Sequence, residues 1–243
     1  MDLHGKVALV TGGARRVGRV ISEALAHAGA HVVVNYHTSA ADAERLCSQL
    51  ARTGASATAV QADISRGSEV HRLLEIVGTQ LGRLDVVINN ASVFATAPLL
   101  EITEEMWDHV LAVNLKGPFL VAQAAAPLLK QSGAGNIINI ADLSALQPWP
   151  SYAHHSVSKA GLLHLTKILA RALGPEVRVN AIAPGTVLPP EDYDGTAGDG
   201  TPDRRVVAQK GTPEDVVRAI FYLLESNFVT GQVVIVDGGR MLL

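Results

Sequence analysis

The stretch Thr11-Gly12-Gly13-Ala14-Arg15-Arg16-Val17-Gly18 is the part of the sequence that best indicates the fold. It joins a β-branched run at residues 7–11 to a segment with helical patterning at residues 20–28. Glycine lets the backbone approach a pyrophosphate closely, and a helix N-terminus offers unpaired N–H groups to an anion. Between a strand and a helix, this motif predicts a dinucleotide-binding turn. A purely structural turn is the alternative.

Six further strand-like runs follow, separated by helical segments, at residues 31–37, 57–63, 85–89, 136–140, 178–183 and 232–236. Strands that alternate with helices predict a parallel sheet with right-handed crossovers. We therefore predict an α/β, doubly wound Rossmann fold whose seven-stranded parallel sheet is flanked by helices. No internal repeat or proline-rich linker divides the chain, so residues 1–243 are expected to form a single domain.

Residues 186–203 interrupt this alternation with a stretch rich in Gly, Pro and Asp. Loops of this length are usually functional or disordered. We predict a substrate lid at 186–203, with a plain surface loop as an equal alternative.

Composition and charge indicate which classes of binding partner the protein lacks. The net charge of −3 supplies no basic face for nucleic acid. A single cysteine, Cys47, cannot form an internal disulfide, which fits a reducing compartment. No signal pattern or long apolar stretch is visible, so we expect a cytoplasmic protein without a membrane partner. No metal is expected.

The end of the second strand-like run indicates which dinucleotide binds. Proteins that bind NAD usually place an acid there for the ribose 2′-hydroxyl, whereas a 2′-phosphate is held by cations or hydroxyls. Here the run continues as His37-Thr38-Ser39, with no acid before Asp42, and Arg15 and Arg16 lie in the nearby turn. NADPH is therefore favoured. The alternative is that both arginines belong to a merely solvated turn.

Several short motifs, in this order, resemble the short-chain dehydrogenase/reductase family: the turn at 11–18, Ala62-Asp63, Asn89-Asn90-Ala91, Asn114, Lys159, Pro184-Gly185 and Asp237-Gly238-Gly239. The resemblance implies that Asp63 bonds the adenine edge, that Asn114 holds a water in a proton relay, and that Lys159 holds the nicotinamide ribose. It implies a cofactor site made of Gly12, Arg15, Arg16, Val17, Gly18, His37, Thr38, Ser39, Asp63, Ile64, Asn90, Ala91, Lys159, Pro184 and Gly185.

The chain departs from the family's usual pattern at two positions. Most members carry a tyrosine four residues before the lysine and a serine thirteen residues before the tyrosine; here these are His155 and Asp142. Asp142, together with Arg16 in place of a glycine and Asn90-Ala91-Ser92-Val93-Phe94, resembles pteridine reductases. That likeness implies that Phe94 stacks a pterin on the nicotinamide and that the substrate contacts are Arg16, Ser92, Phe94, Asp142 and Tyr152.

Two of these assignments have structural alternatives, because Phe94 could be core packing and Asp142 a structural acid. The proton donor also stays open. A histidine can supply a proton near neutral pH, but the cation Lys159 opposes protonation of His155 while an ionised Asp142 favours it. Tyr152, three residues before His155, would share a helix face with it and is the second candidate. His154 is expected on the surface.

We therefore predict an NADPH-dependent oxidoreductase that reduces a pterin, with Asp142, His155, Lys159, Asn114 and Tyr152 at the catalytic centre. One alternative is a 3-oxoacyl thioester reductase or other carbonyl reductase of the same family. Another is an NADP(H)-binding protein with little catalysis because His155 replaces the tyrosine. Apolar helical patterns at 104–130 and 156–173 resemble the family's subunit contacts and predict a homotetramer; covering the sheet would also require apolar faces.

Overall fold

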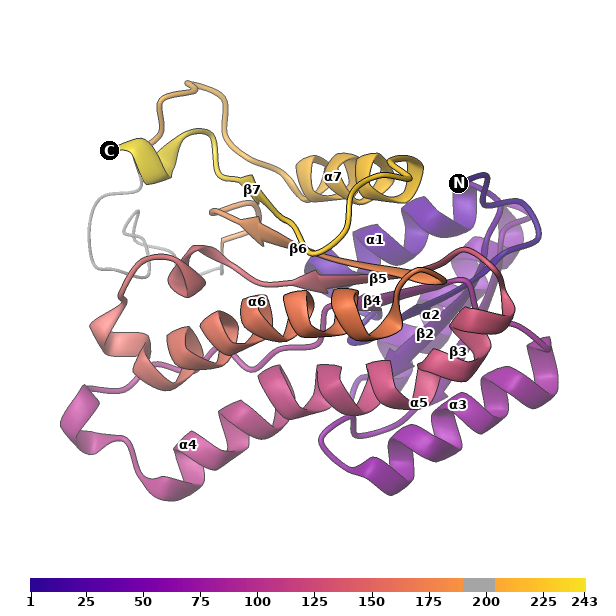
Figure 1. Ribbon diagram of the computed structural model, residues 1–243, viewed down its shortest axis with the longest axis horizontal. Helices are drawn as coiled ribbons and strands as arrows, with labels where there is room; N and C mark the ends of the chain where they lie inside the picture. The colour runs from indigo at the N-terminus through magenta and orange to yellow at the C-terminus, as the bar shows by residue number, and fades with distance from the viewer. Residues whose placement is uncertain (190–203) are drawn as a thin grey trace.

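The computed structural model describes residues 1–189 and 204–243. The described strands form one parallel sheet in the order β3-β2-β1-β4-β5-β6-β7 (Figure 1). The strands are β1 (Val7–Val10), β2 (His31–Tyr36), β3 (Ser56–Gln61), β4 (Val86–Asn89), β5 (Gly135–Ile140), β6 (Val177–Pro184) and β7 (Val233–Val236). This order confirms the predicted seven-stranded, doubly wound Rossmann fold.

Helices cover both faces of the sheet because each central strand sends side chains into two apolar cores. In β1, Ala8 and Val10 enter one core, and Val7 and Leu9 enter the other. The first core includes side chains of α1 (Arg16–His27), α2 (Ala40–Arg52) and α7 (Pro213–Glu225), and the second those of α3 (Gly67–Leu81), α5 (Gly117–Gln131) and α6 (Ala153–Leu173). Figure 1 shows α1 and α7 on one side of the sheet and α3, α5 and α6 on the other.

The predicted helix at 104–130 is instead two helices. α4 (Glu104–Leu111) and α5 are joined by a π-helical turn at Ala112–Lys116. The starts of α1 and α6 also lie three or four residues earlier than predicted, and neither has a side-chain hydrogen bond at its N-cap. Without a capping residue, the sequence carries no local signal for those boundaries. Short 3-10 helices complete the described chain at Leu99–Glu101, Leu143–Ala145, Pro150–Tyr152 and Arg240–Leu242.

The predicted lid at 186–203 falls mostly on residues 190–203, which lie outside the described residues, so its role stays a prediction. In the described part of the chain, no helix is both long enough and apolar enough to cross a membrane.

Strand β1 lies between β2 and β4. The chain therefore builds the sheet toward one edge from β1 to β3 and toward the other edge from β4 to β7, so the direction reverses beside β1. In open α/β sheets, ligands bind in the crevice that this reversal leaves at the carboxyl ends of the strands.

Candidate active site

The glycine-rich turn after β1 is tied to the end of β4. The Thr11 hydroxyl accepts hydrogen bonds from the backbone N–H groups of Asn90 (3.0 Å) and Ala91 (3.1 Å). The Asn90 amide donates to the carbonyl groups of Thr11 (3.0 Å) and Gly12 (3.1 Å). A Cβ at Gly18 would collide with the Gly12 carbonyl oxygen and the Asn90 amide, so this packing requires glycine. The start of α1 therefore comes close to the strand ends, as a pyrophosphate site needs.

Arg16 occupies the position where most of the family carries the turn's middle glycine. Its φ is 50°, in the left-handed region that disfavours a side chain. The guanidinium donates to the Leu188 carbonyl oxygen across the mouth of the crevice, with Nη2 at 2.6 Å. Arg15 and Arg16 are both exposed and line the crevice. The turn thus presents cations as well as backbone N–H groups.

A cavity of about 610 Å³ runs along these strand ends, which is within the usual size range of small-molecule sites. Most residues of the predicted site line it: Gly12, Arg15, Arg16, Val17, Gly18, His37, Thr38, Ser39, Asp63, Ile64, Asn90, Ala91, Ser92, Phe94, Asp142, His155, Lys159, Pro184 and Gly185. Asn114 and Tyr152 are not among the lining residues. His109 on α4 and Val187 after β6 line it without any sequence motif pointing to them.

Asp63 stands in the wall of the cavity near the end of β3. Its carboxylate accepts hydrogen bonds from the backbone N–H (2.9 Å) and hydroxyl (2.7 Å) of Ser65 and lies 3.3 Å from the Arg66 guanidinium. These contacts hold the side chain in place. Whether it bonds an adenine edge stays a prediction.

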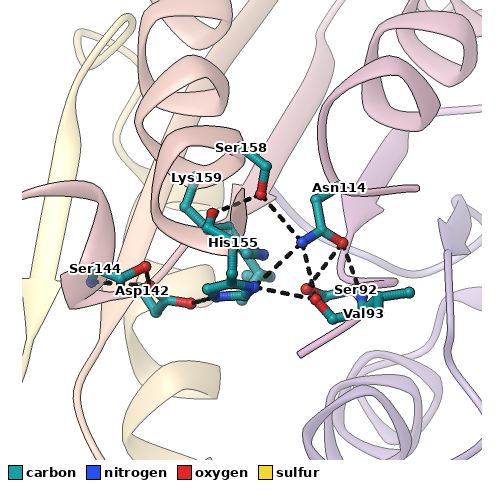
Figure 2. Close-up of polar contacts among 9 residues, drawn as sticks. Ser92, Val93, Asn114, Asp142, Ser144, His155, Ser158 and Lys159 are labelled. Carbon is teal, nitrogen blue, oxygen red and sulfur yellow. Dashed lines mark hydrogen bonds and ion pairs between the residues drawn. The ribbon is translucent and has the colours of Figure 1, made fainter. Parts of the chain in front are cut away.

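Asp142 and His155 form a close pair at the other end of the cavity (Figure 2). His155 Nε2 lies 2.6 Å from Asp142 Oδ2. The other carboxylate oxygen, Oδ1, accepts hydrogen bonds from the backbone N–H (2.9 Å) and the hydroxyl of Ser144. On the far side of the ring, His155 Nδ1 lies 3.0 Å from the Val93 carbonyl oxygen. His155 Nδ1 also lies 3.2 Å from Asn114 Nδ2, so it either donates to the Val93 carbonyl oxygen or accepts from the Asn114 amide, according to the tautomer.

Lys159 lies one helical turn beyond His155 and is almost fully buried. Its ammonium donates to the Ile140 carbonyl oxygen at 2.9 Å. Burial lowers the pKa of Lys159, and the nearby Asp142 carboxylate partly offsets this effect. Burial alone would raise the pKa of Asp142, but the hydrogen bond from His155 and the charge of Lys159 outweigh it and lower that pKa below its usual value. Asp142 is therefore ionised at neutral pH.

Asn114 sits in the π-helical turn and organises the loop that follows β4. Its Oδ1 accepts from the backbone N–H of Val93 (2.8 Å) and from the hydroxyl of Ser92 (3.2 Å). Its Nδ2 donates to the Val93 carbonyl oxygen (3.0 Å) and to Ser158 Oγ (3.1 Å). Figure 2 shows Asn114 and His155 converging on Val93. The water relay implied for Asn114 stays a prediction.

Phe94 follows this anchored segment and is 56% exposed, so the alternative that it is core packing is wrong. Its ring stacks on Tyr152 with centroids 4.6 Å apart and meets the edge of His155 at 4.8 Å. Tyr152 ends the 3-10 helix before α6, so it is not on the helix face expected from its spacing. It lies against Phe94, whereas Phe94 itself lines the cavity.

His154 was expected on the surface, and the structure corrects this prediction. Its side chain is fully buried in the first turn of α6, and neither ring nitrogen has a hydrogen-bond partner among the described residues. Burial lowers the pKa of His154, and the charge of neighbouring His155 adds to the effect. The 3-10 helix at Leu143–Ala145 packs against α6, a contact between segments distant in sequence that the local pattern does not reveal.

Comparisons with known proteins agree with the fold and the motifs. A family model described as enoyl-(acyl carrier protein) reductase matches residues 12–240. A 3-oxoacyl-[acyl-carrier-protein] reductase of Synechocystis is 34% identical and covers 99% of this chain and 98% of its own. Glucose 1-dehydrogenase 2 of Bacillus subtilis is 34% identical, with coverage of 99% and 96%.

Among solved structures, a short-chain dehydrogenase from Burkholderia cenocepacia in complex with NADP aligns with a TM-score of 0.91 and 32% identity. The alignment covers 99% of this chain and 100% of that one. Similarity of this extent, over sequence and fold alike, places the protein among oxidoreductases: the chain belongs to the short-chain dehydrogenase/reductase family.

Proposed function

We propose that this protein is an NADPH-dependent reductase that transfers a hydride to a pterin such as a dihydropteridine, dihydromonapterin or a dihydrofolate. The observation that carries the proposal is the Asp142–His155 pair at 2.6 Å, set beside the exposed ring of Phe94. This pair takes the place of the serine and tyrosine that serve carbonyl reduction in most of the family. A homotetramer and a cytoplasmic location are further predictions.

The residues at the ends of β1 and β2 fit NADPH. The segment His37-Thr38-Ser39 lines the cavity with hydroxyls and a ring nitrogen and places no carboxylate at the end of β2. Arg15 and Arg16 add positive charge next to it. A 2′-phosphate would be attracted here rather than repelled. The NADP complex of the Burkholderia relative is consistent with this choice.

NADPH would supply the hydride, and the chain's own residues would position the substrate. Phe94 offers a flat apolar face to a planar ring. The Asp142 carboxylate offers an acceptor to the N–H groups on the edge of a pterin, which resembles guanidine. The positive charge of the nearby Lys159 ammonium lowers the pKa of Asp142 and so favours its ionised form.

Reduction of a 3-oxoacyl thioester is the second candidate, and the relatives' names favour it over a pterin. The Synechocystis protein is named for this activity, and so are proteins of Staphylococcus epidermidis at 33% identity and S. aureus at 34%. Protonation of a ketone oxygen needs a donor that faces the substrate. His155 is 1% exposed, with its nitrogens engaged by Asp142 on one side and by Val93 and Asn114 on the other. This geometry favours the pterin, because a ring nitrogen is easier to protonate than a ketone oxygen.

The two substrates can be compared in one assay that follows NADPH oxidation with dihydrobiopterin, dihydromonapterin, dihydrofolate and an acetoacetyl thioester. We expect turnover of at least one pterin and little of the thioester. The double variant Asp142→Ser/His155→Tyr introduces the family's usual pair and should gain thioester reduction. Thioester turnover by the unmodified protein without any pterin turnover would refute the proposal. NADPH binding without any turnover would instead indicate a protein that binds the cofactor with little catalysis.

A further inference from the structure

The side chains nearest Asp142 direct polar hydrogens at acceptors inside the protein. His155 and Lys159 are 1% and 3% exposed, and Lys159 donates to the Ile140 carbonyl oxygen. The Ser144 hydroxyl donates to Asp142, and the Ser92 hydroxyl donates to Asn114. The Asp142 side chain is 21% exposed and lines the cavity. This end of the cavity therefore presents a hydrogen-bond acceptor.

The proton between Asp142 and His155 is also held inside the protein. His155 Nε2 and Asp142 Oδ2 lie 2.6 Å apart with one proton between them, and His155 Nδ1 faces the Val93 carbonyl oxygen and the Asn114 amide. With Asp142 ionised, that proton resides on Nε2 and is held internally whichever tautomer Nδ1 adopts. The Asp142–His155 pair therefore directs no N–H or O–H group at a substrate oxygen. A carbonyl group would receive no proton from this pair.

We propose that the site selects substrates whose reacting nitrogen is already cationic, namely flat cyclic iminium ions in general, with Asp142 as the specificity-determining residue. The inference rests on the hydride transfer from NADPH proposed above and widens the substrate class beyond pterins. A dihydropterin, whose C=N group is neutral, enters this class when its ring nitrogen takes a proton from water. Hydride adds to the iminium carbon, the C=N π pair becomes the nitrogen lone pair, and NADPH becomes NADP⁺. Any proton or alkyl group on nitrogen stays there, so the protein donates no proton.

Two features of the site fit such a cation. The Asp142 carboxylate is the exposed member of the Asp142–His155–Lys159 group, so a positive nitrogen meets the negative charge before the buried Lys159 ammonium. The exposed Phe94 ring, backed by Tyr152, provides a face for a planar cation. A neutral ketone of the same shape would gain the stacking but not the charge interaction.

The test compares N-methyl-3,4-dihydroisoquinolinium, a permanent cation, with 1-tetralone, a neutral ketone of the same bicyclic shape. We expect kcat/KM for the iminium to exceed that for the ketone by about 100-fold. Comparable rates for the two compounds would overturn the inference. This comparison needs no variant, so it does not depend on how a substitution folds.

A binding measurement tests Asp142 without turnover. Benzamidine is a flat cation that accepts no hydride, and benzamide is its neutral counterpart. In calorimetric titrations of the NADPH complex, Asp142→Asn should weaken benzamidine binding about tenfold and leave benzamide unchanged. Equal benzamidine affinity in both proteins would contradict the role of Asp142.

Dihydrobiopterin serves as the reference substrate. If it is reduced and the iminium is not, the wider inference fails while the proposed function stands. If only an acetoacetyl thioester is reduced, both fail.

Discussion

Replacing Asp142 by asparagine tests whether the buried pair also stabilises the fold. The carboxylate accepts hydrogen bonds from His155 and Ser144, and asparagine keeps the shape but removes the charge. A hydrogen bond to a charged group contributes about 1 kcal/mol more than one between neutral groups. Loss of that increment at the two partners lowers the free energy of unfolding by about 2 kcal/mol. This is less than the loss expected for a fully buried pair, because Asp142 is 21% exposed.

Thermal unfolding at pH 8 should therefore show Asp142→Asn melting about 4–8 °C below the unmodified protein. The pKa of Asp142 is lower in the folded state, so its stabilisation is present above its usual pKa and is lost as the pH falls through the folded-state value. The two proteins should accordingly begin to converge as the pH falls below about 4 and coincide only below the folded-state pKa of Asp142. Asp42→Asn is the matched control, since Asp42 pairs with Arg45 on the surface and should change stability by less than about 0.5 kcal/mol. Equal melting temperatures of Asp142→Asn and the unmodified protein at pH 8 would refute the reasoning.

Three further substitutions test the cofactor turn and the buried histidine. Arg16→Gly relieves a left-handed φ of 50° but removes a cation and the bond to Leu188, so we expect unchanged thermal stability with NADPH binding weakened about tenfold; unchanged affinity would contradict this. Gly18→Ala forces a methyl group against the Gly12 carbonyl oxygen and should lower both melting temperature and NADPH affinity, each measured against the unmodified protein. His154→Leu removes a buried ring whose pKa is lowered, so the stability that the unmodified protein loses as the pH falls below about 6.5 should be largely retained in the variant; parallel pH profiles would show that His154 is not the cause.

The fold could be predicted because each strand is a short apolar run bounded by turn residues, and the helices between the strands fix a parallel order. The π-helical turn at Ala112–Lys116 could not, because Val113-Asn114-Leu115 is compatible with a continuous helix. What accompanies the wider turn is the bonding of Asn114 to Val93 and Ser158, residues far away in the sequence. Local propensity contains no information on such contacts.

The same limit applies to the site. Spacing from Lys159 singled out Asp142 and His155, and the structure does bring these two side chains together. Spacing could not show that His155 also bonds the Val93 carbonyl oxygen, because this depends on the path of the loop after β4. It also suggested that Tyr152 shares a helix face with His155, whereas Tyr152 ends the 3-10 helix before α6 and its ring lies against Phe94. The substrate contact that the resemblance implies for Tyr152 stays a prediction.

The contact between His155 and the Val93 carbonyl oxygen links the Asp142–His155 pair to the position of the Phe94 ring. Val93 directly precedes Phe94, so the residue paired with Asp142 also holds the backbone that carries the exposed aromatic ring. A tyrosine at position 155 has no nitrogen to place against that carbonyl oxygen, and among the described residues Asn114 alone would then hold the Val93 backbone. Substitution of His155 should therefore change both the proton that Asp142 shares and the position of the Phe94 ring. Substrate choice and proton handling are thus expected to change together in this protein, because the same imidazole ring supports both.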